Sequence, residues 1–337
     1  MNASRAKLIV FVDGIDISED TNAYIQSLSY TDNEADKADD LQLSMDDKDG
    51  VWLSWLEGAK GAEIRAMILQ RSSSGGDGIL DCGTFQLDTV DYSEPPSSVK
   101  MKGTSLPHTS SVRVETRTKA WENISLSAIA NEIADSHGLA CMFESSFDPF
   151  YDRREQVQTS DIVFLQRLCK SAGISLKATD KIIVLFQQRD YEAKAPVIRI
   201  VRGQSNVLSA KFSTKTSDAT YSSCRVMYTD PQTEETIEAA FAAPGAAPGG
   251  QTLVVNEKVS NAGEAHSVAR DRLRDKNKEE QKATFGLVGD VRLVAGVTVE
   301  VSGWGMFDGT YIIEKAGHSV SGGYKTQITT RLILEGY

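Results

Sequence analysis

The stretch GTFQLDTVDYS at residues 83–93 returns in altered form as GTYIIEKAGHS at residues 309–319. Both copies begin Gly-Thr-aromatic, continue with an apolar residue two positions on and an acid next to it, and close on serine. The agreement extends outward, because GAEIRAMI from residue 61 precedes the first copy as GVTVEVSG from residue 296 precedes the second, and Lys100 and Lys325 follow at nearly equal distances. Internal self-similarity indicates repeated structural units. The sequence therefore predicts two copies of one small β-barrel.

Apolar and polar residues alternate through most of the chain, which is the period-two pattern of half-buried strands. The clearest runs are Leu41, Leu43 and Met45; Ile64, Ala66 and Ile68; Cys224, Val226 and Tyr228; Val297, Val299 and Val301; and Ile328, Thr330, Leu332 and Leu334. The expected fold class is mainly β with an α/β insertion, and it contains the two similar small barrels.

The period changes near residue 118, where two helices are predicted. WENISLSAIANEIADSHGL at residues 121–139 has a serine near its start and Gly138 where a left-handed C-cap belongs. TSDIVFLQRLCKSAGISL at residues 159–176 can be capped by Thr159 or Ser160, and Gly173 closes it. IIVLF at residues 182–186 reads as a buried strand. We therefore expect a first β-barrel region at 1–112, a helical α/β domain at 113–190 and a second β-barrel region at 191–337.

Two segments interrupt the second β region. AAFAAPGAAPGGQ at residues 239–251 is rich in Pro, Gly and Ala, and is predicted to be a long mobile loop that holds no strand ladder. Residues 261–280 are predicted to form a polar helix, because Asn261 and Glu264 have capping-box spacing and only a thin apolar stripe follows.

Composition describes an ordinary soluble chain of 337 residues, and its formal net charge of −11 argues against sequence-specific nucleic-acid binding, which depends on clustered Lys and Arg. The apolar run from Leu8 to Val12 is too short for a signal peptide, and no run approaches the roughly 18 residues of a membrane span. We therefore expect cytoplasmic synthesis without membrane insertion. The four cysteines lie far apart and are expected to be free thiols: Cys82, Cys141, Cys169 and Cys224.

SMDDKDGVWLSWLEG at residues 44–58 resembles a calcium loop at first sight. With Gly50 at loop position 6, Met45 and Leu56 fall where the first ligand and the bidentate acid belong, so the calcium interpretation fails. Residues 46–50 are better explained as an acidic turn with its carboxylates in solvent. The Trp and Leu residues that follow, Trp52, Leu53, Trp55 and Leu56, have the spacing of one helical turn that faces a core.

The sequence contains no convincing motif for catalysis or for phosphate binding. GHSVSG at residues 317–322 lacks the helix that must follow a nucleophile elbow, and GWGMFDG at residues 303–309 leads into a predicted strand rather than the helix a phosphate loop requires. The histidines, His108, His137, His266 and His318, show no spacing that implies convergence, and His137 fits a helix C-terminus. We expect no catalytic, cofactor-binding or metal-binding residue and no enzymatic activity.

SLSAIANEIADSHGL followed by QVQTSDIVFLQRLCKSAGISL resembles the central segment of the late control D family. These are the baseplate hub proteins of contractile-tailed phages and phage-like injection devices, akin to the hub part of type VI secretion spikes. Residues 39–68 and 269–326 are similar to the flanking parts, so the resemblance spans nearly the whole chain through distributed patterns rather than a catalytic signature.

The resemblance implies a homotrimer in which three chains present six similar barrels as a ring, joining a sixfold tail tube to a threefold spike and lining the central channel. The implied partners are a trimeric spike protein, the tail tube protein and baseplate wedge proteins, and the implied location is the virion baseplate after assembly in the bacterial host cytoplasm. The chain ends directly after the second barrel's strands, so the spike and any hydrolase are expected on separate polypeptides. A negative channel wall would repel passing DNA.

Two other classes remain open at this stage. One is a cell-wall (peptidoglycan) hydrolase associated with a tail, and the other is a monomeric ligand- or carbohydrate-binding β protein, which needs a pocket with convergent polar and aromatic groups. Molar mass in solution separates these classes most directly.

Overall fold

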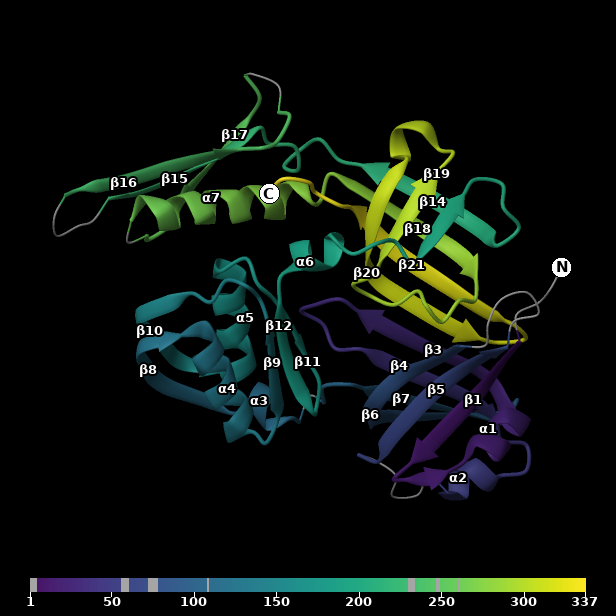
Figure 1. Cartoon of the computed structure of the whole chain (residues 1–337). Coiled ribbons are helices and arrows are strands. Elements are labelled where there is room, and N and C mark those ends of the chain that lie inside the picture. Colours follow the sequence, from purple (N-terminus) through teal and green to yellow (C-terminus); the bar gives the residue numbers. More distant parts are fainter. Residues whose placement is uncertain are drawn as a thin grey trace.

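A computed structural model describes residues 5–55, 61–71, 78–107, 109–229, 234–246, 249–259 and 261–337. The fold is mainly β: one 13-stranded sheet contains the first and the last strand of the chain, and three smaller sheets belong to two insertions (Figure 1). No helix in the described part of the chain is long and apolar enough to cross a membrane.

The N-terminal half of the large sheet comes from residues 5–104. Its elements are β1 (Arg5–Val12), β2 (Ile15–Asp16), α1 (Ser18–Tyr24), β3 (Ile25–Asn33), β4 (Asp40–Asp46), α2 (Val51–Trp55), β5 (Glu63–Arg71), β6 (Gly78–Ser93) and β7 (Ser98–Thr104). The predicted alternation is confirmed, since Leu41, Leu43 and Met45 are all buried in one core with Ile64 and Ile68. Burial of one face explains why these segments fold as strands in this register.

The C-terminal half of the sheet uses residues 198–332. Its elements are β13 (Ile198–Val201), β14 (Val207–Thr214), β18 (Gln281–Val288), β19 (Thr298–Ser302), η1 (Gly305–Phe307), β20 (Gly309–Val320) and β21 (Tyr324–Leu332). Val299, Tyr311 and Ile328 belong to its separate buried core.

The two halves repeat one strand order. The first reads β3-β4-β7-β6-β5 and the second β14-β18-β21-β20-β19, with every neighbouring pair antiparallel. Each copy of the repeated stretch carries a bulge at the same place, because Asp88 of β6 and Glu314 of β20 are skipped in the pairing with β7 and β21. The two copies predicted from the repeated sequence therefore share both the order of their strands and the position of a β-bulge.

The flanks of the repeat also correspond. Gly61 donates its N–H to the Leu87 carbonyl at 3.0 Å, and Gly296 donates to the Ile313 carbonyl at 2.8 Å. Both glycines have positive φ, +84° and +83°, which a residue with a Cβ rarely adopts. The two lysines are different: the register sets Lys100 opposite Asp91 but places Gln327, not a lysine, at the corresponding position of β21.

The halves meet where β20 pairs antiparallel with β3, from Lys315 opposite Asn33 to Val320 opposite Leu28. The halves thus form one continuous sheet, and among the described strands the hydrogen-bonded order runs from β14 to β2 without closing on itself.

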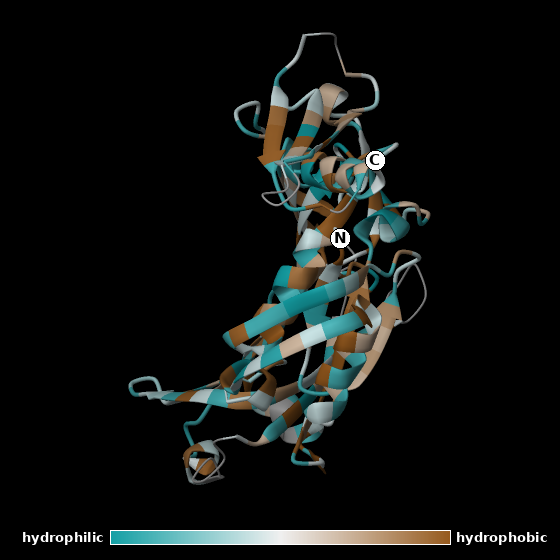
Figure 2. Cartoon of the chain, turned by 90° about the vertical axis from the view of Figure 1, so that its left-hand side faces the viewer, coloured by the Kyte–Doolittle hydropathy of each residue, from teal (hydrophilic) through white to brown (hydrophobic). Residues whose placement is uncertain are grey.

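The first insertion is an α/β unit between β7 and β13. Its elements are α3 (Ser111–Val114), β8 (Thr116–Ser125), α4 (Leu126–Ser136), β9 (Ala140–Glu144), β10 (Phe150–Ser160), α5 (Asp161–Ser171), β11 (Ser175–Ala178), β12 (Ile182–Phe186) and α6 (Gln188–Glu192). Strands β9 and β12 are parallel, and the ribbon of β8 and β10 is largely hydrophilic in the view of Figure 2.

The predicted ends of these helices are largely confirmed. Ser125 caps α4, since its side chain accepts a hydrogen bond from the N–H of Ala128, and Gly138 follows the helix with φ +68°. Ser160 occupies the N-cap position of α5 but makes no capping hydrogen bond with its side chain. Gly173 closes α5 with φ +65°.

The second insertion is an arm between β14 and β18, formed by β15 (Ser223–Thr229), β16 (Thr236–Ala242), β17 (Thr252–Asn256) and α7 (Ala262–Asn277). The sheet packs on α7 through Cys224, Val226 and Leu273, and the arm projects from the body (Figure 1). The predicted loop at 239–251 is wrong at its start, because residues 239–242 pair with β15. Alanine and phenylalanine side chains are compatible with a strand at residues 239–242, and Pro244, which has no N–H to donate, comes only after the strand ends. The corresponding connection in the first half, between β3 and β4, is only residues 34–39.

Candidate functional site

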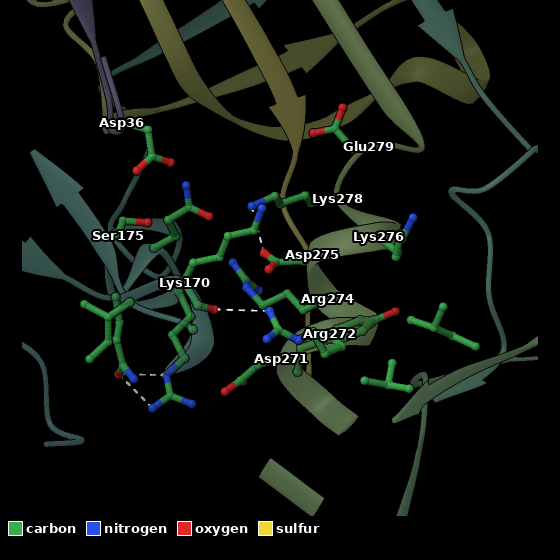
Figure 3. Close-up of a pocket in the computed structure, with 18 of the residues that line it drawn as sticks. Asp36, Lys170, Ser175, Asp271, Arg272, Arg274, Asp275, Lys276, Lys278 and Glu279 are labelled. Carbon is green, nitrogen blue, oxygen red and sulfur yellow. Dashed lines mark hydrogen bonds and ion pairs between the residues drawn. The ribbon is translucent and has the colours of Figure 1, made fainter. Parts of the chain in front are cut away.

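A charged pocket of about 510 Å³ lies where α7 meets the end of α5, the start of β11 and helix α6 (Figure 3). Cations outnumber acids along its wall. The cations are Lys170, Arg189, Lys215, Arg272, Arg274, Lys276 and Lys278, and the acids are Asp36, Asp218, Asp271, Asp275 and Glu279.

Most of these cations are already paired within the chain. Arg272 makes a bidentate contact with Glu257, at 2.8 and 3.0 Å, and also donates to the Lys170 carbonyl at 3.3 Å. Lys276 contacts Asp218 at 2.8 Å, and Lys278 contacts Asp275 at 2.9 Å; both residues of the second pair are labelled in Figure 3. The pocket is therefore a charged contact between the α/β insertion and the arm, and not a field of free positive charge.

Beneath the pocket, Glu192 of α6 contacts Arg274 of α7 at 2.6 Å and Arg331 of β21 at 2.5 Å. Arg331 is fully buried and also lies 3.6 Å from Glu314, the bulged acid of β20. Glu34, after β3, accepts a hydrogen bond from Gln188 at 3.0 Å, and burial raises its pKa to about 7. One short helix thus joins the arm and both halves of the sheet.

A second clamp holds the α/β insertion to the sheet. Lys177 of β11 places its Nζ 2.7 Å from Asp32 Oδ1, 3.0 Å from Asp39 Oδ2 and 2.8 Å from the Asn33 carbonyl. The other oxygen of Asp32 accepts the N–H of Ala295, in the second half of the sheet, at 2.8 Å. Burial raises the pKa of Asp39 to about 6.

A chain of polar side chains connects Ser111, His137 and Asp161. The Ser111 hydroxyl lies 2.6 Å from His137 Nδ1, and His137 Nε2 lies 2.7 Å from Asp161 Oδ2. Asp161 is fully buried, accepts a hydrogen bond from Gln156 and forms a 2.5 Å ion pair with Arg117. A carboxylate only accepts, so His137 Nε2 carries the proton that faces Asp161.

This arrangement contains the hydrogen bonds of a Ser-His-Asp triad, but its surroundings favour a structural role. A serine nucleophile needs N–H groups aimed at a developing oxyanion. The nearby N–H groups of Arg113 and Val114 both donate to the Ser110 carbonyl. The three residues tie α3 to the end of α4 and the start of α5. Sequence reasoning missed the contact because no local spacing links these positions.

The acidic turn at residues 46–50 is a helix cap. Asp47 is buried, and its two carboxylate oxygens accept the N–H groups of Trp52 and Leu53 at 2.8 and 3.1 Å. The expectation that its acids all face solvent is therefore wrong for Asp47. Trp52 is buried as expected, whereas Leu53 is exposed; the side chain of Trp55 and residue Leu56 lie outside the described residues.

The two glycine-containing motifs have the structural roles that the sequence indicates. GWGMFDG at residues 303–309 leads into strand β20, and its turn is held by Asp308, which accepts the N–H of Trp304 at 2.7 Å. GHSVSG at residues 317–322 runs from β20 into the hairpin with β21. Neither motif opens an α-helix, and the first contains only the short 3-10 helix η1.

Histidines and cysteines do not converge in the described part of the chain. His266 contacts the Ala240 carbonyl, His318 is buried between the sheet halves, and His108 lies outside the described residues. All four cysteines are free: Cys82, Cys169 and Cys224 are buried, and Cys141 is half-buried. Among the described residues no group of three or more His, Cys, Asp or Glu side chains could hold a metal ion.

Comparison with known proteins agrees with this architecture. The family model described as phage tail baseplate hub (GPD) matches residues 107–324. A probable baseplate hub protein of Escherichia phage 186 is 24% identical over 178 residues, covering 48% of this chain and 41% of the relative. That of Escherichia phage P2 is 25% identical over 205 residues, covering 59% and 50%. This chain thus spans half or less of the length of these relatives.

The fold is shared with a 43 kDa tail protein of prophage MuSo2 from Shewanella oneidensis, with a TM-score of 0.73 and 15% identity over 97% of this chain and 98% of that one. The chain therefore has the fold of this tail protein. It belongs to the phage tail baseplate hub (GPD) family.

Proposed function

We propose that this chain is the structural hub of a contractile phage tail or phage-like injection device, adapting a sixfold tail tube to a threefold spike and lining the central channel. The single observation that carries the proposal is the repeated five-strand order with matching bulges at Asp88 and Glu314. Two similar units in one chain let three chains present six similar surfaces to a tube, while keeping threefold symmetry for a spike.

The proposal includes a homotrimer in which the two β units act as small barrels of one ring. It divides the chain into a first β region at 1–112, an α/β domain at 113–190 and a second β region at 191–337. Its partners are a trimeric spike protein, the tail tube protein and baseplate wedge proteins, and its location is the virion baseplate after assembly in the host cytoplasm. The net charge of −11 suits a channel wall that repels DNA.

Molar mass in solution tests the hub role. Light scattering of the purified chain should give about three times 36.7 kDa across the micromolar range. A monomer whose mass does not change with concentration would contradict the hub proposal and favour the ligand-binding alternative.

A tail-associated hydrolase is the second candidate, because Ser111, His137 and Asp161 are in hydrogen-bond contact. Peptidoglycan incubated with the chain and with Ser111→Ala separates the two functions. The hub proposal expects no release of soluble fragments by either protein. Release by the parent chain that Ser111→Ala abolishes would establish the hydrolase.

A further inference from the structure

Several backbone edges of the large sheet have no strand beside them in the described part of the chain: the outer sides of β2 and β13, and one edge each on β14 and β6. Strand β14 ends the sheet and pairs only with β18. Strand β6 pairs with β5 only as far as Gln86, so residues 89–93 pair with β7 on one side and with no strand on the other. An unpaired row of N–H and C=O groups is a template for another strand.

The equivalent edges are paired with each other inside the chain. Strand β3 has the place of β14 in the repeat, and the second part of β20 has the place of residues 89–94. Following the register across each half, Tyr30 corresponds to Phe212 and His318 to Tyr92. In the β20–β3 joint His318 lies directly opposite Tyr30.

Burial differs between the paired and the unpaired edges. Leu28 is fully buried at the joint, while Ala210, its counterpart on β14, is exposed. His318 is fully buried, while its counterpart Tyr92 is 39% exposed. The β20–β3 joint therefore buries positions whose counterparts on β14 and on residues 89–94 are exposed.

The two open edges also carry opposite charge. Strand β14 and the residue after it provide Lys211 and Lys215, both exposed. The edge of β6 provides Asp91, which also contacts Lys102 of β7 at 3.2 Å, and, directly after the strand, Glu94, also exposed. Opposite potentials favour encounter of the two edges and fix their register.

We propose that β14 of one copy pairs antiparallel with residues 89–94 of a second copy, repeating between chains the β20–β3 joint found within the chain. The register sets Tyr92 opposite Phe212, Ser93 opposite Lys211 and Thr89 opposite Lys215. Such a contact uses different edges on the two copies, so it is heterologous and builds a ring when its rotation closes. This inference rests on the proposed hub function and specifies the interface between its copies.

Disulfide trapping tests the register. The double variant Ser93→Cys with Lys211→Cys, mildly oxidised, should run as covalent dimer and trimer on a non-reducing denaturing gel, since directly opposite strand residues lie within disulfide reach. The control Ser93→Cys with Leu208→Cys displaces one thiol by about 10 Å along β14 and should remain monomeric on the gel. Neither single variant should crosslink.

The results of this trapping experiment distinguish a failure of the proposed strand pairing from a failure of the proposed hub function. Trimer mass by light scattering without disulfide in the first variant, or with equal disulfide in the control, would overturn the proposed pairing and leave the hub role standing. A monomer in solution would overturn both.

Charge reversal provides a second test without cysteines. Lys211→Glu with Lys215→Glu should raise the concentration for half-assembly at least about tenfold, because it sets acids against Asp91 and Glu94. Adding Asp91→Lys and Glu94→Lys in the same chain should restore assembly. Lys258→Glu, exposed after β17 in the arm, is the control, and an equal loss in that variant would count against the pairing.

Discussion

His318 of β20 stacks on Tyr30 of β3, with ring centroids 5.9 Å apart, where the two halves of the large sheet join. His318 Nε2 lies 3.0 Å from the Leu293 carbonyl, so this nitrogen carries the proton, and Nδ1 accepts from the Tyr324 hydroxyl at 2.8 Å. The joint is therefore built around a neutral imidazole whose two nitrogens are both satisfied.

This joint predicts a loss of stability in mild acid. Burial lowers the pKa of His318 to about 4, whereas an unfolded histidine titrates near about 6.5. As the pH falls, the unfolded chain takes up the proton first, so the contribution of His318 to the free energy of unfolding should fall between about pH 6.5 and about pH 4, by on the order of 3 kcal/mol over the full range. Glu34 and Asp39, whose folded-state pKa values are raised, contribute in the opposite sense, so the His318 effect is the difference between the parent chain and His318→Gln. Urea unfolding at pH 7 and pH 4.5 measures it. His318→Gln should reduce this pH dependence, and an unchanged slope would assign it to other groups.

The Lys177 clamp predicts that removing its charge is costly. Lys177→Met should lower the free energy of unfolding by about 3 to 5 kcal/mol, because Asp32 and Asp39 would remain buried without their cation. Adding Asp39→Asn should recover part of the loss. Lys181→Met removes an exposed contact with Glu63 and should cost no more than about 1 kcal/mol. Equal losses from the two lysine variants would contradict the clamp.

The buried cap predicts an effect of Asp47 that calcium does not change. Asp47→Ala should cost about 0.5 to 2 kcal/mol, since the N–H groups of Trp52 and Leu53 lose their acceptor. Asp49→Ala, on the exposed side of the turn, should cost little. Thermal unfolding with and without millimolar calcium should give the same midpoint for the parent chain. A rise of several degrees that both substitutions together abolish would instead identify a calcium site.

The cysteines predict an order of alkylation. Burial raises the pKa of Cys82 and Cys169, so these thiols have little thiolate and little access to reagent in the native chain. Cys141 is half-buried and should react first with iodoacetamide. After denaturation without reductant, mass spectrometry should find all four cysteines modified. A disulfide-linked peptide would contradict the expectation of free thiols.

Sequence reasoning found what is encoded in local pattern. Alternation marked Leu41, Leu43 and Met45 as the buried face of a strand, and the repeat anticipated that Asp88 and Glu314 would occupy matching places. It overestimated the loop from residue 239 because alanine is compatible with both a loop and a strand, and here pairing with β15 decides the outcome.

Sequence reasoning could not predict contacts between segments that lie far apart along the chain. The approach of Ser111, His137 and Asp161 depends on how α3, α4 and α5 pack, and the burial of Asp47 depends on a cap that composition describes only as an acidic turn. The β20–β3 joint joins two segments nearly three hundred residues apart, and only the folded chain sets His318 against Tyr30.

The arm has a consequence for symmetry. The connection that spans residues 34–39 in one unit has expanded in the other to hold β15, β16, β17 and α7. In the proposed ring of three chains, the strand framework would repeat at every sixty degrees, while the arms would project only at every second unit. Growth of one loop in one copy of a duplicated unit would then be enough to mark three alternate places on a six-part ring.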